Sequence, residues 1–252
     1  MIKLHKNKSP NFRKISVLFV SQVFLGSFPV ALFLIYVFYI RRSSQFSDYD
    51  ISIGVIFASV MTLSLLGYSF ASKKYNILVS GYRGERFLVK IAKKLTGDYT
   101  VFTNLPVRYK KNRSELDLLL IGEHGVLIIE VKNHSGVILG SDGAENWLQR
   151  KYYRKGKTTE IEMENPFNQI KRQREILKSI LRANGFDVWI DSILFFSGNP
   201  SLRLKVNGHI AVASSENELI GLISDYQSKI PPAQETRDGI IRILKNINKK
   251  PI

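Results

Sequence analysis

The chain has 252 residues, with 17 Gly, 8 Pro and no Cys, enough for one large domain or a domain with an appendage. The low Gly and Pro content argues against extensive disorder. The lack of Cys excludes disulfides, thiolate metal sites and cysteine nucleophiles, and fits a reducing compartment. A formal net charge of +16 favours polyanionic partners, either nucleic acid or acidic lipid headgroups.

Residues 1–14 form a basic N-terminal segment, and an uncharged run follows from Ile15 to Ile40. At about 1.5 Å per residue this run can cross a hydrocarbon core of roughly 30 Å. Pro29 is tolerable because neighbouring helices or a kink can absorb the lost hydrogen bond. The run is too long for the apolar part of a signal peptide, so it predicts a membrane-spanning helix.

A second uncharged run, residues 51–71, predicts a second span, and residues 15–72 therefore form a transmembrane hairpin. Cations flank the two outer ends of the hairpin: Lys3, Lys6, Lys8, Arg13, Lys14, Lys73, Lys74, Arg83 and Arg86. The connecting loop has Arg41 and Arg42, with Asp48 and Asp50 nearby. The positive-inside rule then places both ends, and the large C-terminal part, in the cytoplasm.

The remaining residues alternate between helical and strand patterns. An amphipathic helix is expected from near Gly84, and apolar strands at Leu116–Ile121 and Val126–Val131 flank a tight turn. A helix begins at Asn165-Pro166, and another is capped at Ser215. We predict an α/β fold with a mixed central sheet flanked by helices, with residues 81–185 as its core and 186–252 completing it.

Asp117 and Glu130 lie on the two adjacent apolar strands, where a buried charge is costly unless a cation compensates it. Lys132 projects to the same face as Glu130, because side chains alternate along a strand. The three side chains can therefore converge. Carboxylates suit Mg²⁺ or Mn²⁺, which lowers the pKa of a bound water, while an ammonium offsets charge on a phosphate. The spacing predicts a metal-dependent site that hydrolyses phosphodiester bonds, although a structural ion pair is the alternative.

Several segments resemble the nuclease-related domain (NERD), a branch of the PD-(D/E)XK nuclease superfamily with a restriction-endonuclease-like fold. They are GYRGERFLVKIAKKL, SELDLLLIGEHGVLIIEVKNHSG, Trp147 and NPFNQIKRQREIL, within residues 81–185. The resemblance implies that Asp117, Glu130 and Lys132 form the catalytic core. It also implies that Glu85 is the helix carboxylate, joining the metal ligands, and that Gln169 is a further polar site residue. Leu116 stands where the superfamily's name expects Pro.

Basic residues interleaved with aromatics have the composition of a surface that contacts phosphates and bases. The candidates for nucleic-acid contact are Lys110, Lys111, Arg113, Lys151, Arg154 and Lys155. Ordinary solvated edges and anionic lipid are the alternatives for these residues. His124 and His134 lie near the key strands and are treated as ordinary turn or surface histidines.

The sequence therefore predicts a membrane-anchored, Mg²⁺- or Mn²⁺-dependent endonuclease or phosphodiesterase, with DNA favoured as substrate. The alternative from another class is a noncatalytic nucleic-acid-binding or scaffolding membrane protein that keeps a nuclease fold. Hydrolysis of another phosphate ester is a third possibility. The core motif does not identify the substrate, because one fold serves many functions.

Overall fold

The structure is a computed structural model of the whole chain. It describes every residue except Met1, Lys8, Pro10, 43–47, 154–155, His209 and 250–252. The chain divides into two compact units. One is Pro10–Tyr82, and the other combines Met1–Ser9 with Arg83–Ile252.

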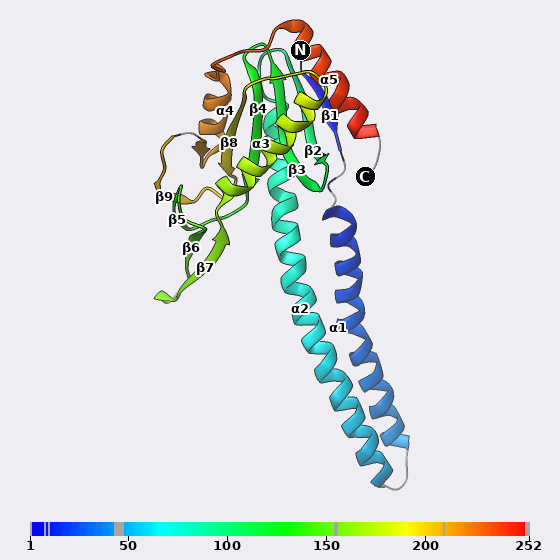
Figure 1. Cartoon of the computed structure of the whole chain (residues 1–252). Coiled ribbons are helices and arrows are strands. Elements are labelled where there is room, and N and C mark those ends of the chain that lie inside the picture. Colours follow the sequence, from blue (N-terminus) through cyan, green and yellow to red (C-terminus); the bar gives the residue numbers. More distant parts are fainter. Residues whose placement is uncertain are drawn as a thin grey trace. The chain divides into compact units, whose positions relative to one another are not determined.

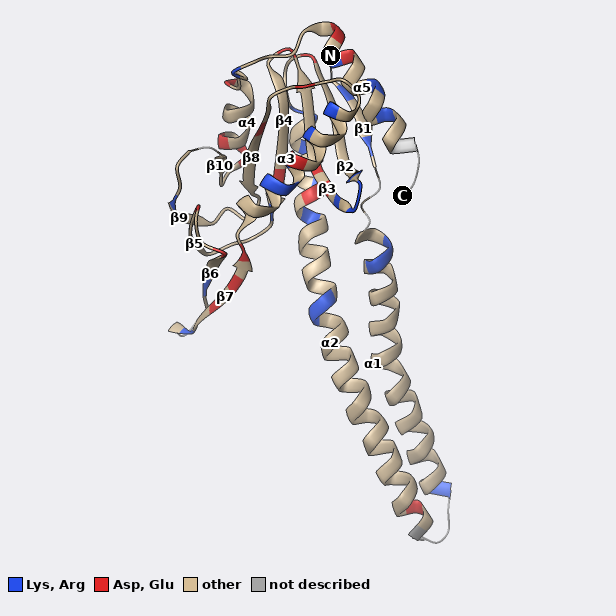
Figure 2. Ribbon diagram, viewed as in Figure 1, with Lys and Arg blue, Asp and Glu red and all other residues tan. Residues whose placement is uncertain are grey.

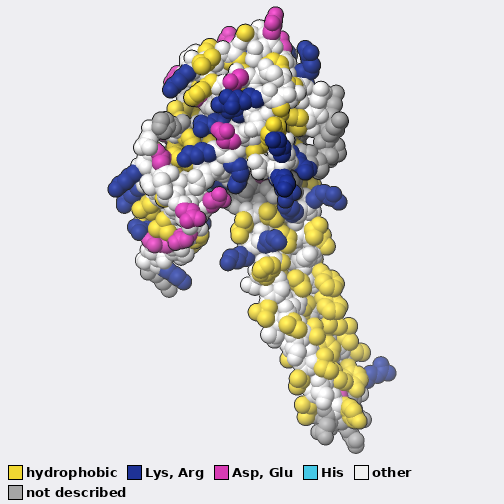
Figure 3. Space-filling model, in the orientation of Figure 1, with side chains coloured by type: hydrophobic (Ala, Val, Ile, Leu, Met, Phe, Trp, Pro, Cys, Tyr) yellow, Lys and Arg dark blue, Asp and Glu magenta, His cyan; other side chains and the backbone are white. Residues whose placement is uncertain are grey.

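Two long apolar helices form a hairpin, α1 (Asn11–Arg42) and α2 (Asp48–Ala92), shown in Figure 1. Within this unit Tyr36 stacks on Phe57 at 4.9 Å, and the Ser64 hydroxyl donates to the Leu25 carbonyl at 2.6 Å. Most of the large apolar side chains are exposed, and Figure 3 shows them along the hairpin. Both helices are long and apolar enough to cross a membrane. Only 6% of the most apolar window of each helix is buried, so the helices present an extensive apolar surface.

The amphipathic helix expected from near Gly84 does not begin there, because residues 84–92 are the last part of α2. No proline separates the second apolar run from this stretch. Isolated glycines such as Gly81 and Gly84 weaken a helix without ending it. One helix of 45 residues therefore replaces the two that the pattern suggested.

The second unit contains a six-stranded mixed sheet in the order β1-β2-β3-β4-β8-β10. Its strands are β1 (Lys3–Lys6), β2 (Tyr99–Tyr109), β3 (Asn112–Gly122), β4 (Gly125–Lys132), β8 (Ile190–Phe196) and β10 (Ala211–Ala213). The β2, β3 and β4 strands are antiparallel, whereas β1, β8 and β10 each pair in parallel with a neighbour. The edge strand β1 comes from the segment before the hairpin, which no sequence pattern marked as a strand.

Helices cover both faces of this sheet, as in Figure 1. One face packs against α3 (Pro166–Ala183) and α5 (Gln234–Lys249), and the other against the end of α2 and α4 (Glu216–Ser224). Asn165 caps α3 by accepting from the Phe167 N–H, and Ser215 caps α4 by accepting from the Glu218 N–H. The predicted starts of both helices are confirmed, because a side-chain oxygen satisfies a free N–H in the first turn. The predicted mixed α/β fold is confirmed as well.

A separate four-stranded sheet has the order β7-β6-β5-β9. Its strands are β5 (Val137–Ser141), β6 (Asn146–Tyr152), β7 (Thr158–Glu164) and β9 (Ser201–Lys205). Gly136 enters β5 with φ +87°, and a Cβ there would overlap the Arg150 carbonyl. The strands β9 and β10 lie on each side of Asn207-Gly208 and do not pair with each other. Instead β9 pairs with β5, and β10 pairs with β8.

Candidate active site

The site begins where β3 separates from β4. The two strands pair from Gly122↔Gly125 to Leu118↔Ile129, while β4 continues along β8 as far as Lys132↔Phe196. At the separation, Oδ2 of Asp117 accepts a hydrogen bond from the Val131 N–H at 2.9 Å. The Asp117 carboxylate thus serves as the hydrogen-bond acceptor in place of a backbone carbonyl of a paired strand. This places Asp117, which is partly exposed, beside the end of β4.

Glu130 is almost completely enclosed, with 1% of its surface exposed. Its Oε1 accepts from Nζ of Lys132 at 2.8 Å, and its Oε2 accepts from Nε2 of Gln173 at 2.7 Å. Nζ of Lys132 also donates to Oε1 of Gln169 at 2.7 Å. Gln169 and Gln173 are four residues apart on α3, so one helical face presents both amides to the end of β4. Hydrogen bonds of this kind are what a buried carboxylate requires.

The Asp117 and Glu130 carboxylates are close enough to influence each other. Burial raises the pKa of Asp117 well above its usual range, and the negative charge of Glu130 raises it further. The Val131 N–H and the positive charge of Lys132 act in the opposite direction, and the charge of Glu85 adds a smaller increase. A bound cation would favour the charged form of Asp117, which the metal-free site disfavours.

Glu85 reaches this region because α2 approaches β4 closely at the preceding residue. A Cβ on Gly84 would stand 3.3 Å from Cγ2 of Val131 and 3.4 Å from Cβ of Asn133. Glu85 itself is buried, with 9% of its surface exposed. The structure therefore brings all five predicted residues, Glu85, Asp117, Glu130, Lys132 and Gln169, into one region.

The residues predicted to contact nucleic acid fall on two separate elements. Lys110, Lys111 and Arg113 are exposed around the tip of the β2–β3 hairpin. Lys151 lies half-buried on β6. Burial lowers the pKa of His134, and the positive charges of Lys132 and Lys151 lower it further. Arg154 and Lys155 lie outside the described residues. Sequence reasoning did not single out the cations on α3, which Figure 2 shows along this helix: Lys171, Arg172, Arg174, Lys178 and Arg182.

Gln173 is the site residue that sequence reasoning missed. It is fully buried, and its Nε2 donates to the Glu115 carbonyl as well as to Glu130, both at 2.7 Å. The available signal was its position four residues after Gln169, on the face of α3 opposite the exposed cations. A glutamine in an amphipathic helix is more often a surface residue, so that spacing alone was not decisive.

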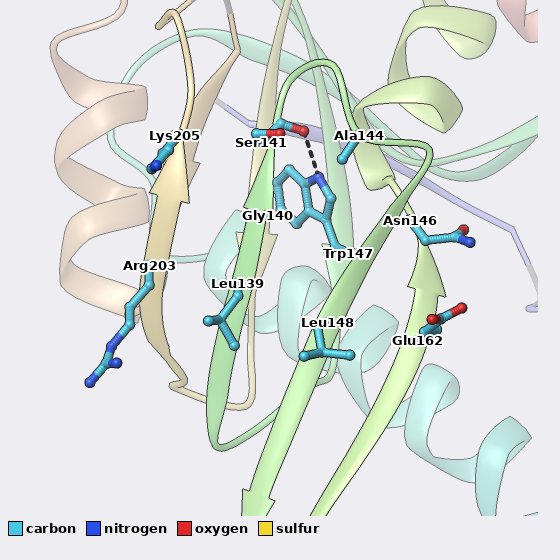
Figure 4. A pocket seen from close by; sticks show the side chains of 10 residues that line it. All are labelled: Leu139, Gly140, Ser141, Ala144, Asn146, Trp147, Leu148, Glu162, Arg203 and Lys205. Atoms are coloured by element: carbon cyan, nitrogen blue, oxygen red, sulfur yellow. Dashed lines mark hydrogen bonds between the residues drawn. The ribbon is translucent and has the colours of Figure 1, made fainter.

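A hollow of about 410 Å³ lies on the four-stranded sheet and contains none of the predicted site residues. Figure 4 shows Trp147 at its centre, with the indole N–H donating to the Ser141 carbonyl at 3.0 Å. The ring packs edge-on against Phe167 at 5.1 Å and is 1% exposed. A side chain on Gly140 would overlap this ring. Trp147 therefore packs the second sheet against α3 and takes no part in the carboxylate cluster.

The sequence of residues 80–197 matches the family model described as the nuclease-related domain. This segment is a nuclease-related domain. The family implies a PD-(D/E)XK-like fold, and the mixed sheet with helices on both faces agrees with it. The matched residues include the end of α2, the β3–β4 hairpin and α3, which carry the carboxylate cluster.

One relative of this nuclease-related domain protein is an uncharacterized protein of Bacillus anthracis, 29% identical over 117 residues. The aligned region is 46% of this chain and 53% of that protein, so the chain spans about half the length of the curated relative it matches. No solved structure matches the chain.

The nuclease-related domain offers two neighbouring carboxylates, which suit a hard divalent cation. Mg²⁺ commonly uses one or two carboxylates and completes its coordination with water and substrate phosphates. Asp117 and Glu130 supply such a pair, and their mutual repulsion is what a cation relieves. Among the residues that the structure describes, no group of three or more Asp, Glu or His side chains could hold a metal ion. Asp117 and Glu130 are the two carboxylates whose chemistry fits such an ion.

Proposed function

We propose that this protein is a membrane-anchored, Mg²⁺- or Mn²⁺-dependent nuclease that hydrolyses phosphodiester bonds, with DNA as the favoured substrate. The observation that carries the proposal is the carboxylate pair at the end of β4. Glu130 is buried and hydrogen-bonded to Lys132, and burial together with the charge of Glu130 raises the pKa of Asp117. Perturbed carboxylates with a cationic partner are typical of catalytic sites.

In this proposal Asp117 and Glu130 hold the cation, which supplies an activated water and neutralises phosphate charge. Glu85, which the resemblance places among the metal ligands, is proposed as an accessory acidic residue beside this pair, because no group of three acidic or His side chains among the described residues could hold an ion. Lys132 offsets the charge that develops on the phosphate. Its Nζ uses two donors on Glu130 and Gln169, and an ammonium has a third for a phosphate or water oxygen.

Nucleic acid is the favoured substrate class because the site belongs to a nuclease-related domain within a strongly basic chain. The exposed cations of α3 and of the β2–β3 hairpin offer contacts for phosphates. Lys110, Lys111, Arg113 and Lys151 remain candidates for these contacts. In this proposal, a phosphate backbone bound by these cations extends to the carboxylates of Asp117 and Glu130.

The membrane anchor is supported by the exposed apolar surface of α1 and α2 and by one feature of the sheet. Lys3 of β1 pairs with Thr100 of β2, although the two apolar helices lie between these strands in the sequence. Both strands must then be on the same side of any membrane that the helices cross. Two crossings satisfy this condition and one does not. The distribution of Lys and Arg favours the cytoplasmic side.

The test uses the full chain in detergent or lipid nanodiscs, because β1 is part of the sheet. Plasmid, single-stranded DNA and RNA are incubated with Mg²⁺, Mn²⁺ or EDTA. We expect metal-dependent cleavage that falls at least about 100-fold in Asp117→Asn and Lys132→Met. Lys205→Met, which removes an exposed cation of β9 outside the proposed phosphate-contacting surface, is the matched control and should keep cleaving.

Equal cleavage by the wild type and by both site variants would disprove the proposal. Binding of nucleic acid without cleavage and without binding of Mg²⁺ or Mn²⁺ by calorimetry would favour the noncatalytic alternative. Cleavage of a small phosphodiester but of no nucleic acid would indicate a different phosphate-ester substrate.

A further inference from the structure

The N-terminal strand β1 makes its last contacts beside the candidate catalytic centre. It pairs in parallel with β2 from Lys3↔Thr100 to Lys6↔Thr103. Directly after it, the Asn7 N–H donates to the Thr103 carbonyl at 3.3 Å. The Asn7 side chain donates through Nδ2 to the Asn104 carbonyl at 3.1 Å. A segment from before the first apolar helix therefore holds the backbone of β2 at Asn104.

Asn104 stands opposite Asp117 in the β2–β3 ladder. The neighbouring pairs are Thr103↔Leu118 and Leu105↔Leu116, which leaves these two residues facing each other. Asn104 has φ +49°, in the left-handed region, within a strand that is otherwise extended. Such a residue interrupts the regular extended backbone of the strand at this point. It lies where β3 leaves β4 and where Asp117 turns to the Val131 N–H.

The left-handed conformation needs an explanation, because it is unfavourable for residues other than Gly. Asn tolerates it better than most residues. Asn104 is 7% exposed, and its buried Oδ1 has no hydrogen-bond partner among the described residues. A hydrogen bond accepted by this oxygen therefore does not explain the left-handed conformation of Asn104. Strained residues of this kind cluster at functional sites, where the surrounding structure maintains them.

We propose that Asn104, held from β1 by Asn7, is a positioning residue that fixes Asp117 for metal binding. The N-terminal strand β1, which precedes the first apolar helix, therefore helps to position a residue of the catalytic centre. This inference rests on the proposed function of Asp117. It predicts that a soluble fragment beginning after the hairpin binds metal poorly even when it folds.

The test compares variants of the full chain in nanodiscs, with two readouts. The first is amide hydrogen exchange at Val131, whose N–H is bonded to Asp117, and it requires neither metal nor substrate. The second is the Mn²⁺ affinity, measured by calorimetry and by the Mn²⁺ concentration that gives half-maximal cleavage. Thermal unfolding identifies any variant that fails to fold.

Asn104→Gly keeps the left-handed backbone without strain and should stay within about twofold of wild type in Mn²⁺ affinity. Asn104→Ala should weaken Mn²⁺ binding about tenfold and speed exchange at Val131, because Ala adopts the left-handed conformation less readily than Asn. Asn7→Asp removes the donor with little change in shape and should weaken binding about threefold to tenfold. Lys6→Ala, at an exposed position of the same strand, is the matched control and should change neither readout.

Unchanged Val131 exchange in both Asn104→Ala and Asn7→Asp would overturn the inference. A Gly variant as impaired as the Ala variant would also overturn it, because the backbone conformation would then not be what Asn104 contributes. If wild type binds Mn²⁺ but cleaves nothing, the proposed function fails. In that case the Mn²⁺ affinity and the amide exchange at Val131 still test the positioning role of Asn104.

Discussion

The hydrogen bond from Gln173 to Glu130 gives the sharpest prediction about stability. Gln173→Leu removes a fully buried amide that donates to the Glu130 carboxylate and to the Glu115 carbonyl, both at 2.7 Å. A hydrogen bond to a charged group contributes about 1.5 to 3 kcal/mol, and a neutral one about 1 kcal/mol. We expect the free energy of unfolding to fall by about 3 kcal/mol, because the buried carboxylate loses one of its two partners.

The assay is thermal unfolding of the full chain in detergent, in EDTA. A loss of about 1 kcal/mol lowers Tm by roughly 2 to 4 °C in a domain of this size, so we expect a fall of about 6 to 12 °C. The same substitution in a Glu130→Gln background should cost about 1 kcal/mol less, because the acceptor is then uncharged. Lys171→Leu, at an exposed position of the same helix, should change Tm little.

A fall in Tm of less than about 3 °C would refute this reasoning. An equal cost in the Glu and Gln backgrounds at position 130 would also refute it. Either result would mean that Gln173 does not stabilise the carboxylate, and that its amide is a packing group.

Three further predictions follow from individual contacts. In EDTA, Asp117→Asn should raise Tm most at pH values above the raised pKa of Asp117, where the wild type must bury a charged carboxyl beside Glu130. The gain should shrink as the pH falls through that pKa, because protonation removes the same penalty, and thermal unfolding across a pH series measures it. Added Mg²⁺ should stabilise only the wild type. Gly136→Ala should cost about 2 to 4 kcal/mol, since it places a Cβ against the Arg150 carbonyl at a positive φ, and a Tm within 2 °C of wild type would contradict this expectation. Lys110→Ala should weaken DNA binding and lower the salt dependence of Kd by about one counterion; a filter-binding salt series measures this, and an unchanged slope would remove Lys110 from the interface.

Local patterns were sufficient wherever the deciding interaction lies within a short stretch of sequence. The uncharged run from Ile15 to Ile40 predicted the first apolar helix, and the Asn165-Pro166 pair predicted the start of α3. The antiparallel turn between Gly122 and Gly125 fixes the register by counting, which sets Asp117 opposite Glu130. The convergence of the carboxylates with Lys132 was therefore foreseeable, while their catalytic role stays a prediction.

Other features depend on residues that are distant in the sequence. The strand KLHK at Lys3–Lys6 is too short for a periodic signal, and it is a strand because β2 offers a free edge nearly a hundred residues later. Gln173 is indistinguishable from a surface glutamine until α3 packs over Glu130. The left-handed Asn104 has no turn motif beside it, because neighbouring strands rather than local preference impose its conformation.

The sequence by itself thus determined the apolar hairpin and the placement of Asp117 and Glu130 on adjacent strands, because short stretches of sequence encode both features. Several motifs between residues 81 and 185 indicated the family of the domain. The tertiary structure decided which further side chains surround that pair. Only packing brought Gln173 to the Glu130 carboxylate and the N-terminal strand to Asn104, since burial depends on what lies across the interface.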